Sequence, residues 1–209
     1  MVLSIALFFL AYLIGSIPSA VWIGKMFYGT DVRLEGSKNA GATNTFRVLG
    51  KRAGIIVLTL DIAKGVGAVC LSYEYGPDAY NPADLLLVRL LLGLSAVLGH
   101  LYPVFAGFRG GKGVATLTGV AFAVFPWAGL LAVAIFILTF LISRYVSLSS
   151  MLAAVSFALA VLFIFYRDVS HQTAVVVIVS CIPLLVIYTH RQNIGRLVQG
   201  KENRFLFRK

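Results

Sequence analysis

The sequence predicts an all-α integral membrane protein with seven transmembrane helices, built as a single domain over residues 1–209. Three observations favour this fold class. The chain is 59% hydrophobic and 12% charged, whereas a soluble domain is about 45–50% apolar and about 25% charged. Its mean hydropathy is +0.91. The apolar residues also form runs close to the length of a membrane-spanning helix. These features exclude a disordered chain, a disulfide-framed secreted domain and an ordinary soluble enzyme.

Seven apolar stretches account for most of the chain. They are residues 2–23, 54–73, 85–107, 113–125, 128–143, 149–166 and 172–189. The first stretch lacks a basic start and is longer than the apolar region of a signal peptide, so we interpret it as a retained helix. The fourth and fifth are short, and Pro126-Trp127 between them is typical of a tight interfacial turn. These two stretches can also be interpreted as one re-entrant pair.

The charge distribution predicts that the N-terminus lies outside and the C-terminus in the cytoplasm. With this orientation, 15 of the 18 Lys and Arg residues fall in inner segments, as the positive-inside rule requires. These are Lys25, Arg33, Lys38, Arg47, Lys51, Arg52, Arg109, Lys112, Arg144, Arg191, Arg196, Lys201, Arg204, Arg208 and Lys209. The outer segments carry Arg167 with Glu74, Asp78, Asp84 and Asp168. The net charge of +10 is therefore explained without a nucleic acid partner.

The longest inner segment contains the small, polar run Gly36-Ser37-Lys38-Asn39-Ala40-Gly41-Ala42-Thr43-Asn44, followed by Arg47. Backbone amides, hydroxyls and side-chain amides in such a run can turn toward an anion. Thr43 or Asn44 is expected to cap the next helix, which places Arg47 one turn later on the same side as Asn44. A capped helix start after a turn explains the run equally well.

The second inner segment, Gly107-Phe108-Arg109-Gly110-Gly111-Lys112-Gly113-Val114-Ala115-Thr116, places two cations among four glycines before an apolar helix. A glycine-rich turn at a helix N-terminus favours anions, because free amides, the helix dipole and a lysine converge there. It is not a Walker A loop, since the glycine spacing is one residue short and Gly113 replaces the magnesium-binding Ser or Thr. The alternative is a flexible inner loop, which does not explain the entropic cost of four glycines.

The third inner segment, His190-Arg191-Gln192-Asn193-Ile194-Gly195-Arg196-Leu197, closes the last apolar stretch. On a helix, His190, Asn193 and Arg196 share one face. Cations near a helix C-terminus also relieve the helix dipole. That explanation gives no reason for Asn193 or for a histidine that can be neutral.

Five polar residues outside these segments each allow a structural interpretation. Ser147 and Ser149 are interpreted as caps of the sixth helix. Asp61 and Lys64 lie three residues apart inside the second stretch and predict an intramembrane ion pair, either structural or part of a site. His100 either makes a hydrogen bond in the core or supports the glycine-rich loop.

Several catalytic arrangements are absent from the sequence. No His has an Asp five positions later, and Gly93–Val97 lacks the second glycine of a nucleophile elbow. No His, Cys and carboxylate cluster suits a catalytic zinc. Cys70 and Cys181 lie in apolar runs and are expected to be buried thiols that form neither a disulfide nor a metal site. We therefore expect no metal and no cofactor, so an enzyme with this sequence needs a donor that is already activated.

Taken together, these motifs resemble the bacterial acyl-phosphate:glycerol-3-phosphate acyltransferases, over nearly the whole chain. The similar segments are Ala11–Ser19, Gly36–Asn44 with Arg47, Gly99–Thr116, and His190 with Asn193, Arg196, Gly200 and Glu202. The family has Ser-Gly-Asn where this chain has Ser37-Lys38-Asn39. Lys38 is expected to strain or reshape the turn if that position needs a positive φ.

The resemblance implies a seven-helix enzyme of the bacterial inner membrane with its active site at the cytoplasmic face. It would transfer a fatty acyl group from acyl phosphate to the sn-1 hydroxyl of glycerol 3-phosphate, the first acylation step of phospholipid synthesis. The products would be lysophosphatidic acid and inorganic phosphate. Its partners would be these substrates and the bilayer, with no obligate protein partner. The implied catalytic residues are Ser37, Arg47, Lys112, His190 and Asn193. The implied substrate-binding residues are Asn39, Gly41, Thr43, Asn44, Gly110, Gly111, Gly113, Thr116 and Ser147.

We hypothesise that the donor phosphate is held by the first motif, through Ser37, the loop amides, Thr43 and Asn44. Glycerol 3-phosphate would be held by Arg47, Lys112, Ser147 and Asn193. His190 would orient the acceptor, and either His190 or the donor phosphate would take the hydroxyl proton. One alternative is a membrane transporter of a phosphorylated small molecule, which would need polar residues along a path between both faces. Another is a scaffold whose inner loops bind anionic lipid.

Overall fold

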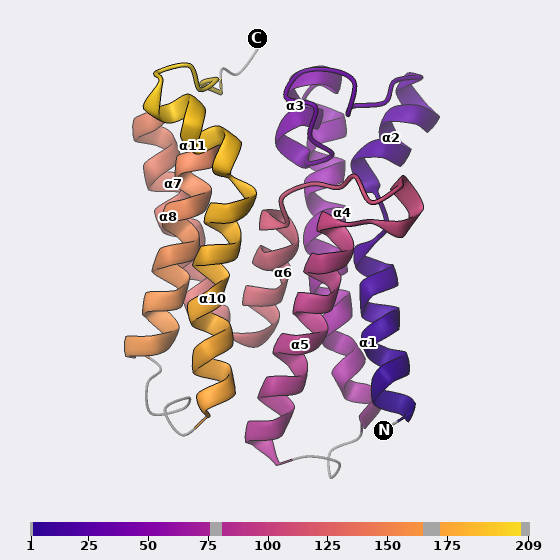
Figure 1. Cartoon of the computed structure of the whole chain (residues 1–209), viewed down its shortest axis with the longest axis vertical. Helices are drawn as coiled ribbons and strands as arrows, with labels where there is room; N and C mark the ends of the chain where they lie inside the picture. The colour runs from indigo at the N-terminus through magenta and orange to yellow at the C-terminus, as the bar shows by residue number, and fades with distance from the viewer. Residues whose placement is uncertain (1, 76–80, 165–171, 206–209) are drawn as a thin grey trace. The chain divides into compact units, whose positions relative to one another are not determined.

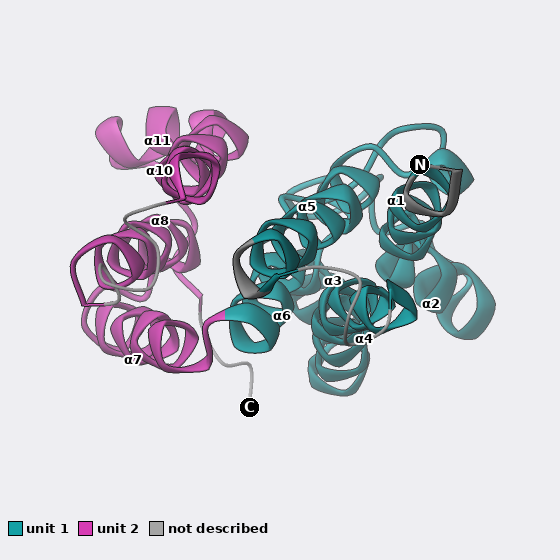
Figure 2. Ribbon diagram, turned by 90° about the horizontal axis from the view of Figure 1, so that it is seen from below, with its two compact units in different colours: residues 1–124 teal, residues 125–209 magenta. Residues whose placement is uncertain are grey.

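The computed structural model describes residues 2–75, 81–164 and 172–205, and every regular element in these ranges is helical. This confirms the all-α class. The chain divides into two compact units, Met1–Val124 and Phe125–Lys209 (Figure 2), and a single functional domain stays a prediction. Five charged residues used to predict the orientation lie outside the described residues, namely Asp78, Arg167, Asp168, Arg208 and Lys209.

Unit 1 contains the first two sequence motifs. Its described elements are α1 (Val2–Gly15), α2 (Ser19–Tyr28), α3 (Ala42–Leu49), α4 (Lys51–Cys70), the 3₁₀ segment η1 (Leu71–Tyr75), α5 (Pro82–Leu101), the 3₁₀ segment η2 (Val104–Ala106) and α6 (Val114–Val124). Helices α2 and α3 and the loop around η2 lie at the end of this unit opposite the N-terminus (Figure 1). Both motifs of unit 1 are therefore displayed at the same end.

Glycine and other small residues allow the helices of unit 1 to pack closely. Gly15 of α1 lies against the backbone of Ala96 in α5, and Gly65 of α4 lies against the carbonyl of Thr116 in α6. Close backbone approach of this kind is a main source of helix association in lipid. Thr116 is fully buried at its contact with α4. This position favours a packing role for Thr116 over the predicted contact with substrate.

Unit 2 contains the third sequence motif. Its described elements are α7 (Pro126–Ser143), α8 (Val146–Leu159), the π-helical segment η3 (Ala160–Ile164), α10 (Thr173–Thr189) and α11 (Arg191–Val198). Helix α10 packs on α8 and η3, and Val161, Val175 and Val179 are almost completely buried. Helix α11 follows α10 after a bend of 61°. The bend at His190 separates the apolar helix from the polar one.

Each of the seven predicted apolar stretches overlaps a helix in the described residues, but the lengths differ. Four helices are long and apolar enough to cross a membrane: Lys51–Tyr75, Asp84–Ala106, Pro126–Ser143 and Val146–Ile164. There are up to six such spans if the bent pairs Ile5–Gly15 with Ser19–Tyr28 and Thr173–Thr189 with Arg191–Val198 each count as one. Helix α6 has 11 residues, so it is about 16 Å long, against a hydrocarbon core of about 30 Å. Seven spans and their orientation stay predictions.

Two expectations about apolar runs are wrong. The first stretch is not one straight helix, because it breaks after Gly15 and bends by 41° before α2. Pro18 precedes α2 and has no N–H to continue the α1 hydrogen-bond pattern. Cys70 and Cys181 are exposed, because a helix in an apolar run also presents side chains outward, where lipid replaces water. An apolar run therefore does not indicate burial inside the protein.

Candidate active site

Asn44 organises the loop that carries the first motif. Its side-chain oxygen accepts a hydrogen bond from the backbone N–H of Ser37 at 2.8 Å. Its amide nitrogen donates to the carbonyls of Val32 at 2.7 Å and Glu35 at 3.1 Å. With 1% of its surface exposed, Asn44 presents almost no surface to a ligand. Its contacts fix the loop backbone, so the structure favours a positioning role over the hypothesised contact with donor phosphate.

Helix α3 begins after Gly41, and no side-chain hydrogen bond caps it. The prediction that Thr43 or Asn44 caps this helix is therefore wrong, because Asn44 reaches back into the preceding loop instead. Ser37 and Arg47 are exposed, while Thr43 is partly buried. The exposed hydroxyl and guanidinium are thus the accessible polar groups among these residues.

Lys38 adopts a φ of 57°, in the left-handed region. Residues other than glycine rarely adopt this backbone conformation, which costs them about 1–2 kcal/mol. The position is the one where the resembling family has glycine, so the expectation that Lys38 strains the turn is confirmed. Asn39 and Gly41, which follow it, are partly buried.

The four glycines of the second motif fold the loop tightly onto the end of α5. Gly107 and Gly113 have φ values of 62° and 80°, where glycine is favoured. A Cβ atom on Gly110 would meet the carbonyl of His100, and one on Gly111 would meet the His100 imidazole. The N–H of Gly111 also donates to the His100 carbonyl at 3.1 Å. Each of the four glycines thus has a backbone angle or a close contact that favours glycine at its position. This argues against the interpretation of the segment as a merely flexible loop.

Helix α6 starts at Val114, directly after this loop. The first N–H groups of a helix have no intrahelical partner and lie at the positive end of its dipole. Lys112, partly buried, stands two residues before the helix. The segment from Lys112 into α6 therefore has the charge and the donors that an anion requires.

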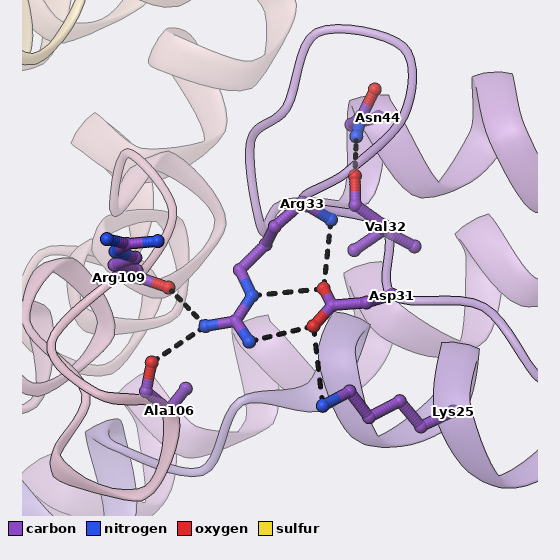
Figure 3. Close-up of polar contacts among 7 residues, drawn as sticks. All are labelled: Lys25, Asp31, Val32, Arg33, Asn44, Ala106 and Arg109. Atoms are coloured by element: carbon purple, nitrogen blue, oxygen red, sulfur yellow. Dashed lines mark hydrogen bonds and ion pairs between the residues drawn. The ribbon is translucent and has the colours of Figure 1, made fainter.

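Arg33 connects the loops of the first two motifs (Figure 3). Its Nε and Nη2 atoms donate to the two carboxylate oxygens of Asp31 at 3.0 and 2.8 Å. Its Nη1 atom donates to the carbonyls of Ala106 at 2.7 Å and Arg109 at 3.5 Å. Lys25 lies 3.4 Å from the same carboxylate. A planar guanidinium can serve the carboxylate and the carbonyls at once, which an ammonium cannot do equally well.

Charge pairing keeps this contact ionised. The guanidinium of Arg33 holds the pKa of Asp31 well below its usual range, against the effect of burial. In turn, Asp31 raises the pKa of Arg33. Both groups are therefore charged at neutral pH, and the loops stay joined over the physiological range.

A small pocket in unit 1 brings the first two motifs together. Its lining residues come from the α1–α2 break, both motifs, α4 and the end of α5: Gly15, Ile17, Pro18, Ser19, Ala40, Lys64, His100, Pro103, Gly110 and Gly111. Lys64, which lines the pocket, forms the ion pair predicted from the sequence, with its Nζ 2.8 Å from Asp61 Oδ1. His100 Nδ1 lies 3.6 Å from the same oxygen. The pocket thus combines loop backbone with buried charge.

In unit 2, Glu202 gathers the polar residues of the third motif. Its Oε1 atom accepts hydrogen bonds from Asn193 at 2.6 Å and Ser147 at 2.8 Å, and its Oε2 atom accepts one from Arg196 Nε at 2.7 Å. Burial disfavours the carboxylate, but these three donors outweigh that effect and hold the pKa of Glu202 below its usual value. Glu202 therefore orients Ser147 and Asn193 as a charged acceptor.

The interpretation of Ser147 and Ser149 as helix caps is wrong. Helix α8 begins after Tyr145 without a side-chain cap. Ser147 turns to Glu202, and Ser149 donates back to the Tyr145 carbonyl at 2.8 Å. Ser147 and Asn193 of the third motif thus share Glu202 as their hydrogen-bond acceptor.

His190 lies between α10 and α11 and is 3% exposed. Its Nδ1 atom is 2.8 Å from the carbonyl of Val186. A carbonyl only accepts, so Nδ1 carries the proton and the lone pair of the neutral ring is on Nε2. The neutral imidazole can therefore accept a hydrogen bond through Nε2.

Comparison with known proteins decides the family. A family model for glycerol-3-phosphate acyltransferase matches residues 5–200. The chain belongs to the glycerol-3-phosphate acyltransferase family. A glycerol-3-phosphate acyltransferase from Listeria welshimeri is 47% identical over 198 residues, covering 95% of this chain and 94% of that protein. One from Chlorobium limicola is 41% identical, covering 98% and 97%. The family resemblance of the motifs is thus confirmed.

Solved structures of this family share the fold. A crystal structure of PlsY (YgiH), an integral membrane glycerol 3-phosphate acyltransferase, in the glycerol 3-phosphate form is 40% identical with a TM-score of 0.84. The two chains are covered to 97% and 96%. The lysophosphatidic acid form is 38% identical with a TM-score of 0.80, covering 98% of this chain and 96% of that one. The all-helical arrangement is therefore the family's own.

Sequence reasoning missed the roles of Arg33 and Glu202 in this acyltransferase family member. The charge pattern identifies Arg33 only as an inner cation, although Asp31 two residues earlier signals a local ion pair. Glu202 belongs to the family resemblance, but its place in the sequence does not reveal a contact with Ser147, 55 residues away. Within the part of the chain that the structure describes, no three His, Cys, Asp or Glu side chains gather as a metal ligand set.

Proposed function

We propose that the protein transfers a fatty acyl group from acyl phosphate to the sn-1 hydroxyl of glycerol 3-phosphate. The hydroxyl oxygen attacks the acyl carbon, the bond between that carbon and the phosphate oxygen breaks, and lysophosphatidic acid and inorganic phosphate form. The match to the family model across residues 5–200 carries this proposal. The folded glycine loop at the start of α6 supports it, because both proposed substrates are phosphate esters or anhydrides.

In unit 1, we assign phosphate recognition to accessible groups. Ser37 and Arg47 are exposed, and Lys112 precedes α6 with Gly113 at a positive φ. Ser37 and the neighbouring loop amides would bind the donor phosphate, while Arg47 and Lys112 would bind the phosphate of glycerol 3-phosphate. Asn44 contributes indirectly by holding the loop of Ser37.

In unit 2, we assign the acceptor to His190, Asn193 and Ser147. Glu202 fixes the last two, and Val186 fixes the His190 ring. His190 would orient the acceptor hydroxyl through Nε2, and the departing phosphate oxygen would take the proton. Acyl phosphate is a mixed anhydride with a good leaving group, so positioning can supply about 7–11 kcal/mol of the barrier reduction. Oriented donors at the developing oxyanion add to it.

A His190→Gln variant distinguishes the two candidate bases. Gln retains a polar group near Nε2 but cannot serve as a base. If most of the maximal rate remains, the donor phosphate is the base. If the rate collapses while both KM values hold, His190 is the base.

We also propose that the enzyme is a seven-span protein of a bacterial inner membrane, with the N-terminus outside and the motifs at the cytoplasmic face. The predicted inner position of 15 of 18 cations supports this orientation. Accessibility of single cysteines tests it: a cysteine at exposed Ser37 should react only when the cytoplasmic side is open to the reagent. Cys70 and Cys181 are first replaced by Ala in this background.

The test of function is a donor comparison with detergent-purified protein. We expect lysophosphatidic acid from long-chain acyl phosphate plus glycerol 3-phosphate, also in the presence of EDTA, and none from acyl-CoA. Equal yields from acyl-CoA would contradict the acyl phosphate assignment. If no donor gives product and sealed vesicles containing the protein take up glycerol 3-phosphate, the protein is a transporter and not an acyltransferase.

A further inference from the structure

A buried polar cluster lies directly beneath the glycine-rich loop and has no place in the chemistry proposed above. Asp61 and Lys64 form an ion pair of 2.8 Å with side chains that are 2% and 5% exposed. Ser19 donates to Asp61 at 3.1 Å, and His100 faces the same carboxylate oxygen at 3.6 Å. Three polar groups, one each from α2, α4 and α5, thus converge on the Asp61 carboxylate.

The cluster also reaches the backbone at the α1–α2 break. Lys64 Nζ donates to the carbonyl of Ile17 at 3.2 Å, and Ser19 opens α2. Gly15 and Pro18 from this break line the same pocket as Gly110 and Gly111. The cluster therefore joins the break, α4 and the end of α5 at the level of the loop.

His100 is the member of the cluster that touches the loop. Its carbonyl accepts the N–H of Gly111 at 3.1 Å. Its imidazole lies so close to Gly111 that any Cβ atom there would collide with Nε2 and come within 3.0 Å of Cε1. Gly111 is therefore in close contact with the ring, and Lys112 is the next residue in the loop.

Stability alone gives a weak reason for such a cluster. Removing two charges from water is costly, and apolar replacements of a buried ion pair are often neutral or stabilising. A second role in orientation accounts for its place under the loop. Asp61 lies near Nδ1 of the ring and Gly111 near Nε2, so the carboxylate can fix the ring while the ring contacts the loop.

We infer that Asp61 and His100 are positioning residues for glycerol 3-phosphate binding. Asp61 fixes the His100 imidazole, and the imidazole fixes the position of Gly111 and Lys112 in the glycine-rich loop. This inference rests on the proposed function, because it assigns Lys112 to the phosphate of glycerol 3-phosphate. It predicts that disturbing the ring raises the KM for this substrate and leaves the KM for acyl phosphate unchanged.

The first test uses the steric contact. Gly111→Ala should lower kcat/KM for glycerol 3-phosphate at least about tenfold, since a misplacement of about 1 Å can cost about 100-fold. Combining Gly111→Ala with His100→Ala removes the colliding ring. The fold-loss of kcat/KM in the double variant should therefore be clearly smaller than the product of the fold-losses of the two single variants. Gly67→Ala is the matched control, because a Cβ atom at Gly67 meets nothing within 4 Å. It should behave like the wild type.

The second test separates positioning from a merely structural role. His100→Ala should raise the KM for glycerol 3-phosphate about tenfold, with kcat changed less than about threefold. His100→Asn, which keeps a donor near Nδ1, should recover part of this loss. The double variant Asp61→Asn with Lys64→Met, which leaves no unpaired buried charge, should also raise this KM. A structural defect instead lowers the active fraction, so kcat falls while both KM values stay constant.

Two outcomes overturn the inference, provided that the wild type forms lysophosphatidic acid from acyl phosphate. The first is a folded His100→Ala or His100→Asn protein with the wild-type KM for glycerol 3-phosphate. The second is strict multiplicativity of the Gly111→Ala and His100→Ala losses. If only His100→Asn folds, its KM for glycerol 3-phosphate alone decides, and an unchanged value is the first of these outcomes. A wild type without glycerol 3-phosphate-dependent transfer contradicts the proposed function instead.

Discussion

The Glu202→Gln substitution is the most informative single change in unit 2. Gln keeps the size of the side chain and one carbonyl oxygen, which can still accept from Ser147 and Asn193. Its NH₂ group faces Arg196 Nε, which is also a donor, so the 2.7 Å bond is lost. A hydrogen bond to a charged group contributes about 1.5–3 kcal/mol. Because the Arg196 side chain is 37% exposed, solvent screening reduces this loss to about 1–2 kcal/mol.

The loss should be visible as stability and as substrate affinity. At about 2–4 °C per kcal/mol, the unfolding temperature should fall by about 5 °C. The KM for glycerol 3-phosphate should rise several-fold, because Ser147 and Asn193 lose a charged anchor. Glu202→Ala removes all three acceptor contacts and should cost more on both scales. Glu74→Gln, at an exposed carboxylate, is the control. Wild-type stability and KM in Glu202→Gln would refute the orienting role of Glu202.

Three further predictions concern both units. Arg33→Lys should raise the KM for glycerol 3-phosphate up to about 30-fold, because losing the 2.7 Å hydrogen bond to the Ala106 carbonyl costs about 2 kcal/mol. Steady-state kinetics measure this KM, and Arg52→Lys, at an exposed arginine, is the control. Lys38→Gly should raise the unfolding free energy by about 0.5–1 kcal/mol, which denaturation measures, because φ is 57°. The pKa of Glu202 is lowered on folding, so its stabilisation is complete above its ordinary pKa of about 4.3 and disappears as pH falls through the folded value. Thermal unfolding from about pH 6 to pH 3 should therefore lose more stability in wild type than in Glu202→Gln.

Sequence patterns predicted the helical class because the charge depletion and the lengths of the apolar runs can be read directly from the sequence. They also predicted the Asp61–Lys64 pair, since residues three positions apart on one helix share a face. The strain at Lys38 followed from a glycine position in the family motif. These features are local, so one stretch of sequence contains the information.

Features that depend on distant segments were not predictable in the same way. Asn44 does not cap its helix but forms hydrogen bonds with the preceding loop, because the loop brings the carbonyls of Val32 and Glu35 close to its side chain. Ser147 turns to Glu202, which the C-terminal segment supplies. The glycines of the second motif suggested an anion loop, but their contact with His100 depends on how the chain folds back onto α5. Contacts of this kind become visible only in the three-dimensional structure.

The most direct test of the central claim is phosphate release from a long-chain acyl phosphate, measured with and without glycerol 3-phosphate for wild type and Lys112→Ala. We predict release that depends on glycerol 3-phosphate, forms one lysophosphatidic acid per phosphate, and falls about 100-fold or more in Lys112→Ala. Lys51→Ala, at an exposed cation, should retain wild-type release. Release that ignores glycerol 3-phosphate, or a Lys112→Ala protein as active as the wild type, would contradict the account.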